Sequence, residues 1–289
     1  MKLVRLLVAT VAICLIPIVS MAAKGGFNFI TIDFPGASST QLNGNSTNQI
    51  VGVYLDAQSN THGFVLRGND FTNFDFPGVT SSYLNGVNAN GEVVGTYTDS
   101  SQVPHCYFWK QGTFTTLNPP GLVWSQGANV NGKGEILGSY LSNTTGSVVG
   151  FTWRAGVFTS LHVPNETFPG TLPQGINDQE QIVGAYMDAT DHNVHGFLLS
   201  KGVYTKVDPP GSVYTFAEGI NNSGQIVGFY YDTSGNQHGF ILSNDVYTDI
   251  DIPDAGSTEV NSICANGQIA GFYVDASMKT PGFIGTPHQ

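Results

Sequence analysis

Short apolar runs alternate with turn residues along the whole chain, and one run recurs six times. It consists of two aliphatic residues, a glycine, a variable residue and a tyrosine, at residues 50–54, 93–97, 136–140, 182–186, 226–230 and 269–273. Glycine or asparagine interrupts the apolar runs before two helical turns could form, so the pattern predicts strands. The motif glycines are 43 to 46 residues apart. A strand-rich repeat of about 40–45 residues is typical of one propeller blade.

Each repeat is expected to hold four strands. In the second repeat we predict them at residues 83–88, 92–98, 105–110 and 114–117. The segments between them contain asparagine, glycine or proline, which favour tight turns and end strands. The same division fits all six repeats.

The two ends of the chain indicate how a ring would close. The sixth repeat stops after Gly282-Phe283-Ile284 without a fourth strand, whereas residues 29–36 match residues 71–78, where the fourth strand of the first repeat lies. An N-terminal strand in the last blade would remove the exposed sheet edges of an open array. We therefore predict an all-β fold, a six-bladed β-propeller of four-stranded antiparallel blades, with the ring closed by the N-terminal strand.

The first 22 residues have the composition of a secretory signal peptide. Lys2 and Arg5 precede an apolar run at residues 6–19, and small residues precede a cleavage point near Ala22. No second apolar stretch is long enough to span a bilayer. We expect a secreted, extracellular protein with no membrane insertion, in which residues 23–289 form a single propeller domain and a monomer.

Charge and cysteine usage narrow the range of partners. The chain has 10 basic and 21 acidic residues, a formal net charge of −11, which argues against nucleic acid or an anionic membrane surface as partner. Cys106 and Cys264 fall in the second and sixth repeats, which would not be neighbours in a ring. We therefore expect free, buried thiols and no disulfide.

The repeats resemble those of the bacterial extracellular HAF-repeat proteins, whose units pair a Gly-Ile-Asn…Gly-x-Ile-Val-Gly stretch with a following His-Ala-Phe. The matching residues are 175–177 and 181–184 with His195-Gly196-Phe197, and 219–221 and 224–228 with His238-Gly239-Phe240. Glycine replaces the alanine of the triplet. The resemblance implies secretion and a repeat architecture, and it brings no catalytic motif.

Strand direction predicts that one face of the ring, which we call the crossover face, carries both the loops between second and third strands and the crossovers between blades. Aspartates and histidines gather there, at Asp56, Asp99, Asp188, Asp232 and Asp275, at His62, His105, His195 and His238, and at Asp33, Asp75, Asp208 and Asp251. One interpretation is a ring of ligand or metal sites, with calcium in the oxygen-rich segments 56–60 and 232–236. The interpretation we favour is an Asp–His hydrogen bond across each hairpin, because one pair supplies two ligands where zinc or calcium needs four or more. We therefore predict no metal site and no cofactor.

Aromatic residues on the crossovers vary from blade to blade, unlike the repeated core positions. They are Tyr83, Trp124, Phe168, Tyr214 and Phe216. Rigid aromatic rings beside carboxylates and amides suit sugar recognition. Hydrophobic lids over the blade interfaces are the alternative.

An enzyme would need a different set of residues. Glu218 and Glu259 enter the innermost strands of adjacent blades, so they are candidates for the carboxylate pair of glycoside hydrolysis. The sequence contains no Gly-x-Ser-x-Gly, His-Glu-x-x-His or phosphate-loop motif. Most glutamates only solvate a surface, so the sequence favours a non-catalytic protein.

The prediction is a secreted binding module that recognises an extracellular polysaccharide or another glycan on its crossover face. The predicted ligand-binding residues are Tyr83, Trp124, Tyr214, Phe216, Asp99, His105, Asp232 and His238. The alternatives are a scaffold that binds an extracellular protein, since fold alone does not dictate function, and a polysaccharide-cleaving enzyme that uses Glu218 and Glu259.

Overall fold

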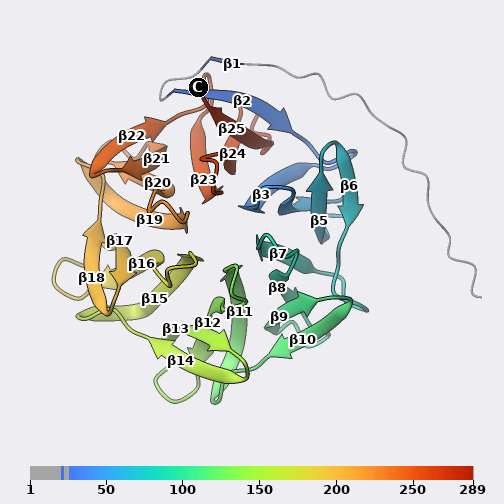
Figure 1. Ribbon diagram of the computed structural model, residues 1–289, viewed down its shortest axis with the longest axis vertical. Coiled ribbons are helices and arrows are strands. Elements are labelled where there is room, and N and C mark those ends of the chain that lie inside the picture. Colours follow the sequence, from blue (N-terminus) through green and yellow to red (C-terminus); the bar gives the residue numbers. More distant parts are fainter. Residues whose placement is uncertain (1–20, 23–25, 289) are drawn as a thin grey trace, which may run out of the picture.

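The computed structural model describes residues 21–22 and 26–288. Most of the predicted signal peptide therefore lies outside the described residues. All the regular elements described are β-strands, and together they form a ring around a central axis (Figure 1). In the described part of the chain no helix is long and apolar enough to cross a bilayer.

Four concentric sets of strands build the ring. The innermost strands are β3 (Ser39–Asn45), β7 (Ser82–Val87), β11 (Leu122–Val130), β15 (Glu166–Ile176), β19 (Ser212–Ile220) and β23 (Ser257–Ile263). The second strands, which carry the repeated motif, are β4 (Ile50–Leu55), β8 (Val93–Thr98), β12 (Ile136–Ser142), β16 (Ile182–Asp188), β20 (Ile226–Asp232) and β24 (Ile269–Val274). The third strands are β5 (Thr61–Arg67), β9 (Pro104–Lys110), β13 (Val148–Arg154), β17 (Val194–Ser200), β21 (Gln237–Ser243) and β25 (Gly282–Pro287). The outer strands are β6 (Asp70–Asn73), β10 (Thr113–Leu117), β14 (Val157–Leu161), β18 (Val203–Val207), β22 (Val246–Ile250) and β2 (Phe27–Ile32), with the short β1 (Met21–Ala22) beside β2. The four strands predicted in the second repeat are confirmed, with bounds that differ by at most one residue.

The hydrogen-bonded sheets are less uniform than predicted. Three of them have four strands each, namely β3 to β6, β7 to β10 and β19 to β22. Strands β11 to β18 form one eight-stranded sheet, because a single parallel bridge between Val148 and Gly170 joins β13 to β15. A five-stranded sheet has the order β1-β2-β25-β24-β23, in which Phe27 lies opposite Pro287 and Ile32 opposite Gly282. The all-β propeller is confirmed, but the expectation of identical four-stranded sheets is wrong for these two.

The motif glycine is explained by the close approach of the innermost strand. A Cβ added to Gly228 would overlap the backbone carbonyl oxygen of Phe216 on β19, and it would also crowd Ala217. The equivalent glycines face the equivalent carbonyls in the other five repeats. Glycine at this position therefore lets the two strands pair closely, just where the innermost strand presents side chains to the centre of the ring.

The hydrophobic core is divided among the junctions between consecutive repeats. Six clusters of buried apolar side chains occur among the described residues, and each combines residues of two neighbouring repeats. For example, Val94 and Phe108 of the second repeat pack with Ile136 and Phe151 of the third. The strand motif therefore buries both of its faces, as a blade between two others must. Cys106 and Cys264 are free and buried, as predicted.

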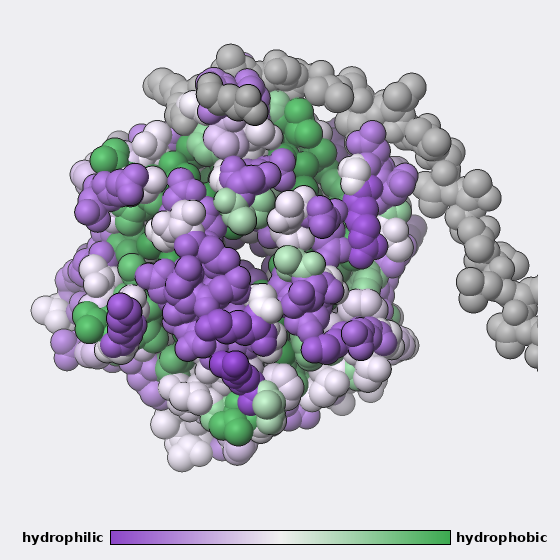
Figure 2. All heavy atoms as spheres, viewed as in Figure 1, coloured by the Kyte–Doolittle hydropathy of each residue, from purple (hydrophilic) through white to green (hydrophobic). Residues whose placement is uncertain are grey.

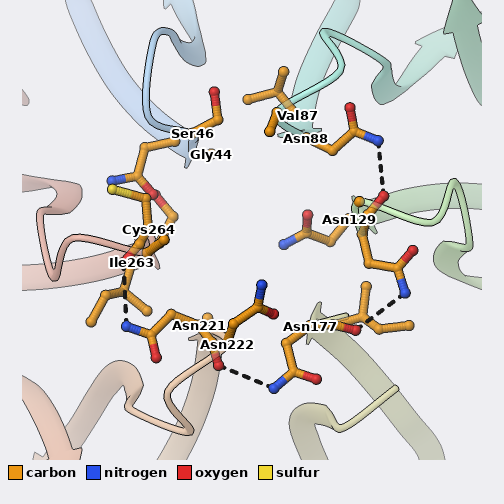
Figure 3. Close-up of a pocket in the computed structure, with 18 of the residues that line it drawn as sticks. Gly44, Ser46, Val87, Asn88, Asn129, Asn177, Asn221, Asn222, Ile263 and Cys264 are labelled. Carbon is orange, nitrogen blue, oxygen red and sulfur yellow. Dashed lines mark hydrogen bonds between the residues drawn. The ribbon is translucent and has the colours of Figure 1, made fainter. Parts of the chain in front are cut away.

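A ladder of asparagines links the short turns that follow the innermost strands. The side-chain amides of Asn88, Asn131, Asn177 and Asn221 each donate to a backbone carbonyl of the next repeat, at 2.8, 3.1, 3.0 and 3.2 Å respectively (Figure 3). We call these residues the asparagine ladder, and the face that carries them the turn face. Around the opening at the centre of the ring, hydrophilic side chains predominate (Figure 2).

Candidate functional site

A concave site, which we call the central cavity, lies at the centre of the ring. It has a volume of about 520 Å³, within the range of small-ligand sites. The innermost strands line it with Gln41, Asn43, Tyr83, Asn85, Gln126, Asn129, Leu172, Gln174, Phe216, Glu218, Glu259 and Asn261, and the second strands add Val53, Ser139, Phe229 and Phe272. Along the innermost strands, which begin at the crossovers, these residues come before the turns that carry the asparagine ladder, whereas turn residues such as Asn88, Asn131 and Asn177 line a separate hollow on the turn face. The cavity therefore lies toward the crossover face.

The structure brings two of the four predicted stacking residues into this cavity. Tyr83 and Phe216 line it, whereas Trp124 and Tyr214 do not. Trp124 and Tyr214 stand two residues before Gln126 and Phe216 on regular stretches of β11 and β19. Because side chains alternate along a strand, both point to the same side as the cavity lining, one step nearer the crossover loops. They therefore belong to the mouth of the cavity rather than to its wall.

Glu218 and Glu259 meet in the central cavity, although the sequence could only suggest that they share a side. Glu259 Oε1 accepts a hydrogen bond of 2.7 Å from Gln237 Nε2, and the Tyr231 hydroxyl donates to Gln237 Oε1 at 3.1 Å. Burial raises the pKa of Glu218 to about 8, the charge of Glu259 adds to this, and a hydrogen bond from Gln174 opposes it. Burial also raises the pKa of Glu259, against the hydrogen bond from Gln237.

The sequence analysis missed the aromatic residues that the second strands contribute. Phe229 and Phe272 line the cavity, and the ring of Phe229 stacks on that of Phe216 with centroids 4.7 Å apart and an interplanar angle of 13°. A signal for them existed in the variable position of the repeated motif. It is aromatic only in the fifth and sixth repeats, which is where the two glutamates enter the cavity.

The aspartates and histidines of the crossover face stabilise their own hairpins. In the first repeat, Asp56 Oδ1 accepts the backbone N–H groups of Gln58 and Asn60, each at 2.8 Å. Its other oxygen lies 3.4 Å from His62 Nε2, and His62 Nδ1 lies 2.9 Å from Asp75. In the fifth repeat, His238 lies 3.6 Å from Asp232 and 3.0 Å from Asp251. The favoured interpretation, a hydrogen bond across each hairpin, agrees with the contact in the first repeat, whereas in the fifth repeat His238 bonds to Asp251 and lies beyond hydrogen-bond distance of Asp232.

The second repeat departs from this arrangement. His105 Nε2 lies 3.1 Å from Asp99, but Asn118 stands where the first repeat has Asp75. His105 Nδ1 is buried and has no hydrogen-bond partner within residues 26–288. Asp99, His105, Asp232 and His238, all predicted to bind ligand, lie in these hairpins and outside the lining of the central cavity.

One group of side chains has the spacing of a cation site. Ligand atoms of Asp188, Asp191 and His195 lie within 4.8 Å of one another, and no other such group occurs among the described residues. Asp191, rather than the predicted Asp188, contacts His195 Nε2, at 3.0 Å, and His195 Nδ1 lies 2.7 Å from Asp208. Both ring nitrogens of His195 are therefore engaged in carboxylate hydrogen bonds, as are those of His62 in the first repeat.

Comparison with known proteins shows the fold. No protein-family model matches the chain, and no curated protein sequence matches it. Among solved structures, AofleA from Arthrobotrys oligospora is similar with a TM-score of 0.57 and 10% identity, over 89% of this chain and 86% of that one. The lectin of Aleuria aurantia, a six-bladed β-propeller with a fucose recognition mode, has a TM-score of 0.54 and 12% identity, over 86% and 91% of the two chains. TolB from Acinetobacter baumannii has a TM-score of 0.56 and 8% identity, over 84% of this chain and 65% of that one.

Proposed function

We propose that this protein is a secreted, non-catalytic module that binds a glycan through its crossover face, with the central cavity as the main site. The observation that carries the proposal is the composition of the cavity. Tyr83, Phe216, Phe229 and Phe272 supply aromatic surface, and the amides and carboxylates around them supply hydrogen bonds. Apolar sugar faces pack on aromatic rings while hydroxyls take directed hydrogen bonds, so this combination suits saccharides. The likeness to a fucose-binding propeller lectin supports the same use of the ring.

We infer a six-bladed ring closed by the N-terminal strand. Six core clusters at successive junctions support this number, and so does the single bridge that connects the two halves of the eight-stranded sheet. The antiparallel pairing of β2 with β25 supports the closure. We also propose that the protein is related to the HAF-repeat proteins, which its repeats support, and that its first 22 residues are a signal peptide, which their composition supports. We propose that it is a monomer.

A glycan array followed by calorimetric titration tests the function. We expect the protein to bind a restricted set of saccharides, and Phe216→Ala to weaken binding at least tenfold because its ring forms part of the cavity wall. Trp124→Ala, at the mouth, should weaken binding less. Phe168→Ala is the matched control, since Phe168 is 67% exposed near the start of β15 and does not line the cavity. A blank array with a folded protein would disprove the proposal.

The same titrations examine calcium. Binding is measured with added calcium and with a chelator, and we expect equal affinity because the hairpin carboxylates already accept hydrogen bonds from their own loops. Loss of binding in chelator would make a cation part of the site.

Two other functions have an observation in their favour. Tyr214, Val123 and Phe168 are exposed apolar side chains on the crossover side, which suits a scaffold that binds an extracellular protein. Glu218 and Glu259 share one cavity, and the raised pKa of Glu218 is a property of general acids in glycoside hydrolysis. Mass spectrometry of the bound saccharide after incubation separates binding from cleavage.

A further inference from the structure

The charged groups of the central cavity all have the same sign. Among the described residues that line it, Glu218 and Glu259 are the charged ones, and none is lysine, arginine or histidine. The remaining lining is amide, hydroxyl, aliphatic and aromatic. A ligand that fills the cavity therefore meets two carboxyl groups and no cationic side chain.

Neither glutamate has a counter-ion among the residues that the structure describes. No ion pair within residues 26–288 includes Glu218 or Glu259, whereas Glu92 and Glu180 both pair with basic side chains. The contacts that hold the two cavity glutamates come from neutral amides, of Gln174 and Gln237. Enclosed carboxylates without a cationic partner are costly, and a cation supplied by a ligand would remove that cost.

We propose that the central cavity recognises a sugar that carries a basic amino group, such as a glucosamine unit of a de-N-acetylated polysaccharide. This inference rests on the proposed glycan-binding function and specifies its ligand class. The ammonium group would lie between Glu218 and Glu259, and the apolar face of the ring would pack against Phe216 and Phe229. Phe216, Phe229 and Glu218 all line the cavity, and the rings of Phe216 and Phe229 stack on each other.

The opposite wall of the cavity fits the uncharged part of such a ligand. Asn85 and Gln126 line it from β7 and β11, and Gln41 and Asn43 add amides from β3, which lies beside β23. Asn43 Nδ2 is engaged with the backbone carbonyl of Leu84 at 2.9 Å, which leaves its oxygen as an acceptor for hydroxyl groups. The cavity therefore combines the two carboxyl groups of β19 and β23 with neutral amides from the other innermost strands.

The charge of the whole chain favours the same class of ligand. A net charge of −11 attracts a polycation toward the ring and repels acidic polysaccharides. A polymer of glucosamine carries one positive charge per unit when its amines are protonated. The acidic surface and the acidic cavity therefore both select for it.

A pair of matched saccharides tests the inference. The full chain is titrated at pH 6 with a β-1,4-linked glucosamine tetrasaccharide and with its fully N-acetylated counterpart. We expect the cationic tetrasaccharide to bind at least tenfold more tightly. Glu259→Gln should weaken its binding at least fivefold. Glu218→Gln should weaken it by less, because the carboxyl of Glu218, whose pKa burial raises to about 8, must release its proton at pH 6 before it can pair with the ammonium group. Glu180→Gln removes the same charge from the turn face, where Glu180 pairs with Lys133 at 3.0 Å, and should change affinity less than twofold.

The outcomes separate this inference from the function on which it rests. Equal or tighter binding of the N-acetylated tetrasaccharide would overturn amine recognition and leave the glycan-binding function standing. An equal loss of binding in Glu180→Gln would also overturn it, since general surface charge would then explain the attraction. If neither tetrasaccharide nor any saccharide of the array binds, both amine recognition and the proposed glycan-binding function are disproved. Circular dichroism spectra of the variants, recorded before titration, confirm that each is folded.

Discussion

The backbone carbonyl oxygen of Phe216 occupies the space that a Cβ on Gly228 would need. Phe216 faces the central cavity, so a glycine that belongs to the repeated motif also sets the position of a wall of the candidate site. The same relationship joins Gly271 to Glu259 in the next repeat. The repeat motif and the site are thus parts of one packing arrangement.

We expect Gly228→Ala to lower the free energy of unfolding by about 3 kcal/mol. The atoms nearest the added methyl group are backbone atoms of Phe216 and Ala217, which cannot move aside as a flexible side chain would. Urea denaturation measures the effect. Gly256→Ala is the control, because the nearest atom to its Cβ is Val274 O at 3.7 Å, and its effect should be below about 0.5 kcal/mol. Equal stability of the two variants would contradict the steric account.

The Nδ1 atom of His105, which has no hydrogen-bond partner among the described residues, predicts a stabilising substitution. Asn118→Asp would give His105 Nδ1 the carboxylate partner that Asp75 gives His62, at 2.9 Å, and Asp208 gives His195, at 2.7 Å. We expect a gain of about 1 kcal/mol at pH 6, the usual contribution of one hydrogen bond to a charged group that remains partly exposed. Thermal unfolding measures it. No gain would show that the Asn118 site does not place a carboxylate near His105.

Asp75→Asn, the reverse change in the first repeat, should alter the pH dependence of the free energy of unfolding. Burial alone lowers the pKa of His62, but hydrogen bonds and charge from Asp75 and Asp56 outweigh it, so the net pKa is raised. A raised folded pKa means that this stabilisation is complete below the unfolded value of about 6.5 and is lost as pH rises through the folded pKa. Asp75→Asn should therefore destabilise the protein at pH 5.5 more than at pH 8.5. The His62 pKa, followed by NMR, should fall in this variant and not in Asn118→Asp.

The fold was largely predictable because each repeat carries its own local instructions. The alternation of apolar and turn residues located the strands of the second repeat to within one residue, since Asn-Gly and Pro-Gly segments end strands wherever they occur. The bridge between Val148 and Gly170, which merges two sheets, was not predictable. It depends on how the crossover after β14 happens to approach β13, and no period in the sequence encodes that approach.

The site was predictable only in part, because the ring brings together residues that are far apart in sequence. Glu218 and Glu259 could be assigned to adjacent innermost strands, but which of Tyr83, Trp124, Tyr214 and Phe216 line the cavity depends on register. A register shift between Ser212 and Tyr214, and another between Ala217 and Gly219, set which side chains of β19 reach the centre. Bulges of this kind leave little trace in a single sequence.

The raised pKa of Glu218 predicts that this residue costs stability in alkaline solution. An acid whose folded pKa, about 8, exceeds the unfolded value near 4.3 keeps full stability below the unfolded value and loses it as pH rises toward the folded one. Glu218→Gln should therefore be more stable than wild type at pH 8, by about 1–2 kcal/mol once water in the cavity is allowed for, and equal to it at pH 4.5. Glu259 and Tyr83, the other titratable groups of the lining, are unchanged in this comparison.

Glu180→Gln serves as the control for that experiment. Ion pairs with Lys133 and Arg154 lower the pKa of Glu180, so its contribution to stability is present at neutral pH and is lost in acid. Its substitution should slightly destabilise the protein at pH 8, the opposite sign to Glu218→Gln. The same sign for both variants would mean that the net charge of the protein, rather than the cavity, governs the pH dependence.

The asparagine ladder makes separate predictions for an interior junction and for the junction between the ends of the chain. Asn131 donates to Asn177 O and also accepts two backbone N–H groups of its own turn, so we expect Asn131→Ala to cost about 2 kcal/mol. In the sixth repeat Cys264 replaces the ladder asparagine, and the link to the first repeat runs instead from Asn45 Nδ2 to Gln268 O, at 2.9 Å. Asn45→Ala should therefore weaken the junction between the first and sixth repeats.

Hydrogen exchange distinguishes the two effects. If the pairing of β2 with β25 depends on the junction between the first and sixth repeats, Asn45→Ala should speed exchange in β2 and β25 by about tenfold while β12 and β16 keep their protection. Asn131→Ala should instead speed exchange in β12 and β16 while β2 and β25 keep their protection. Asn90→Ala, which loses one exposed hydrogen bond to Gly132 O, is the control and should leave both regions within twofold of wild type. Uniform acceleration in Asn45→Ala would mean that the ring opens cooperatively as a whole, and that the asparagine contacts do not define separate junctions.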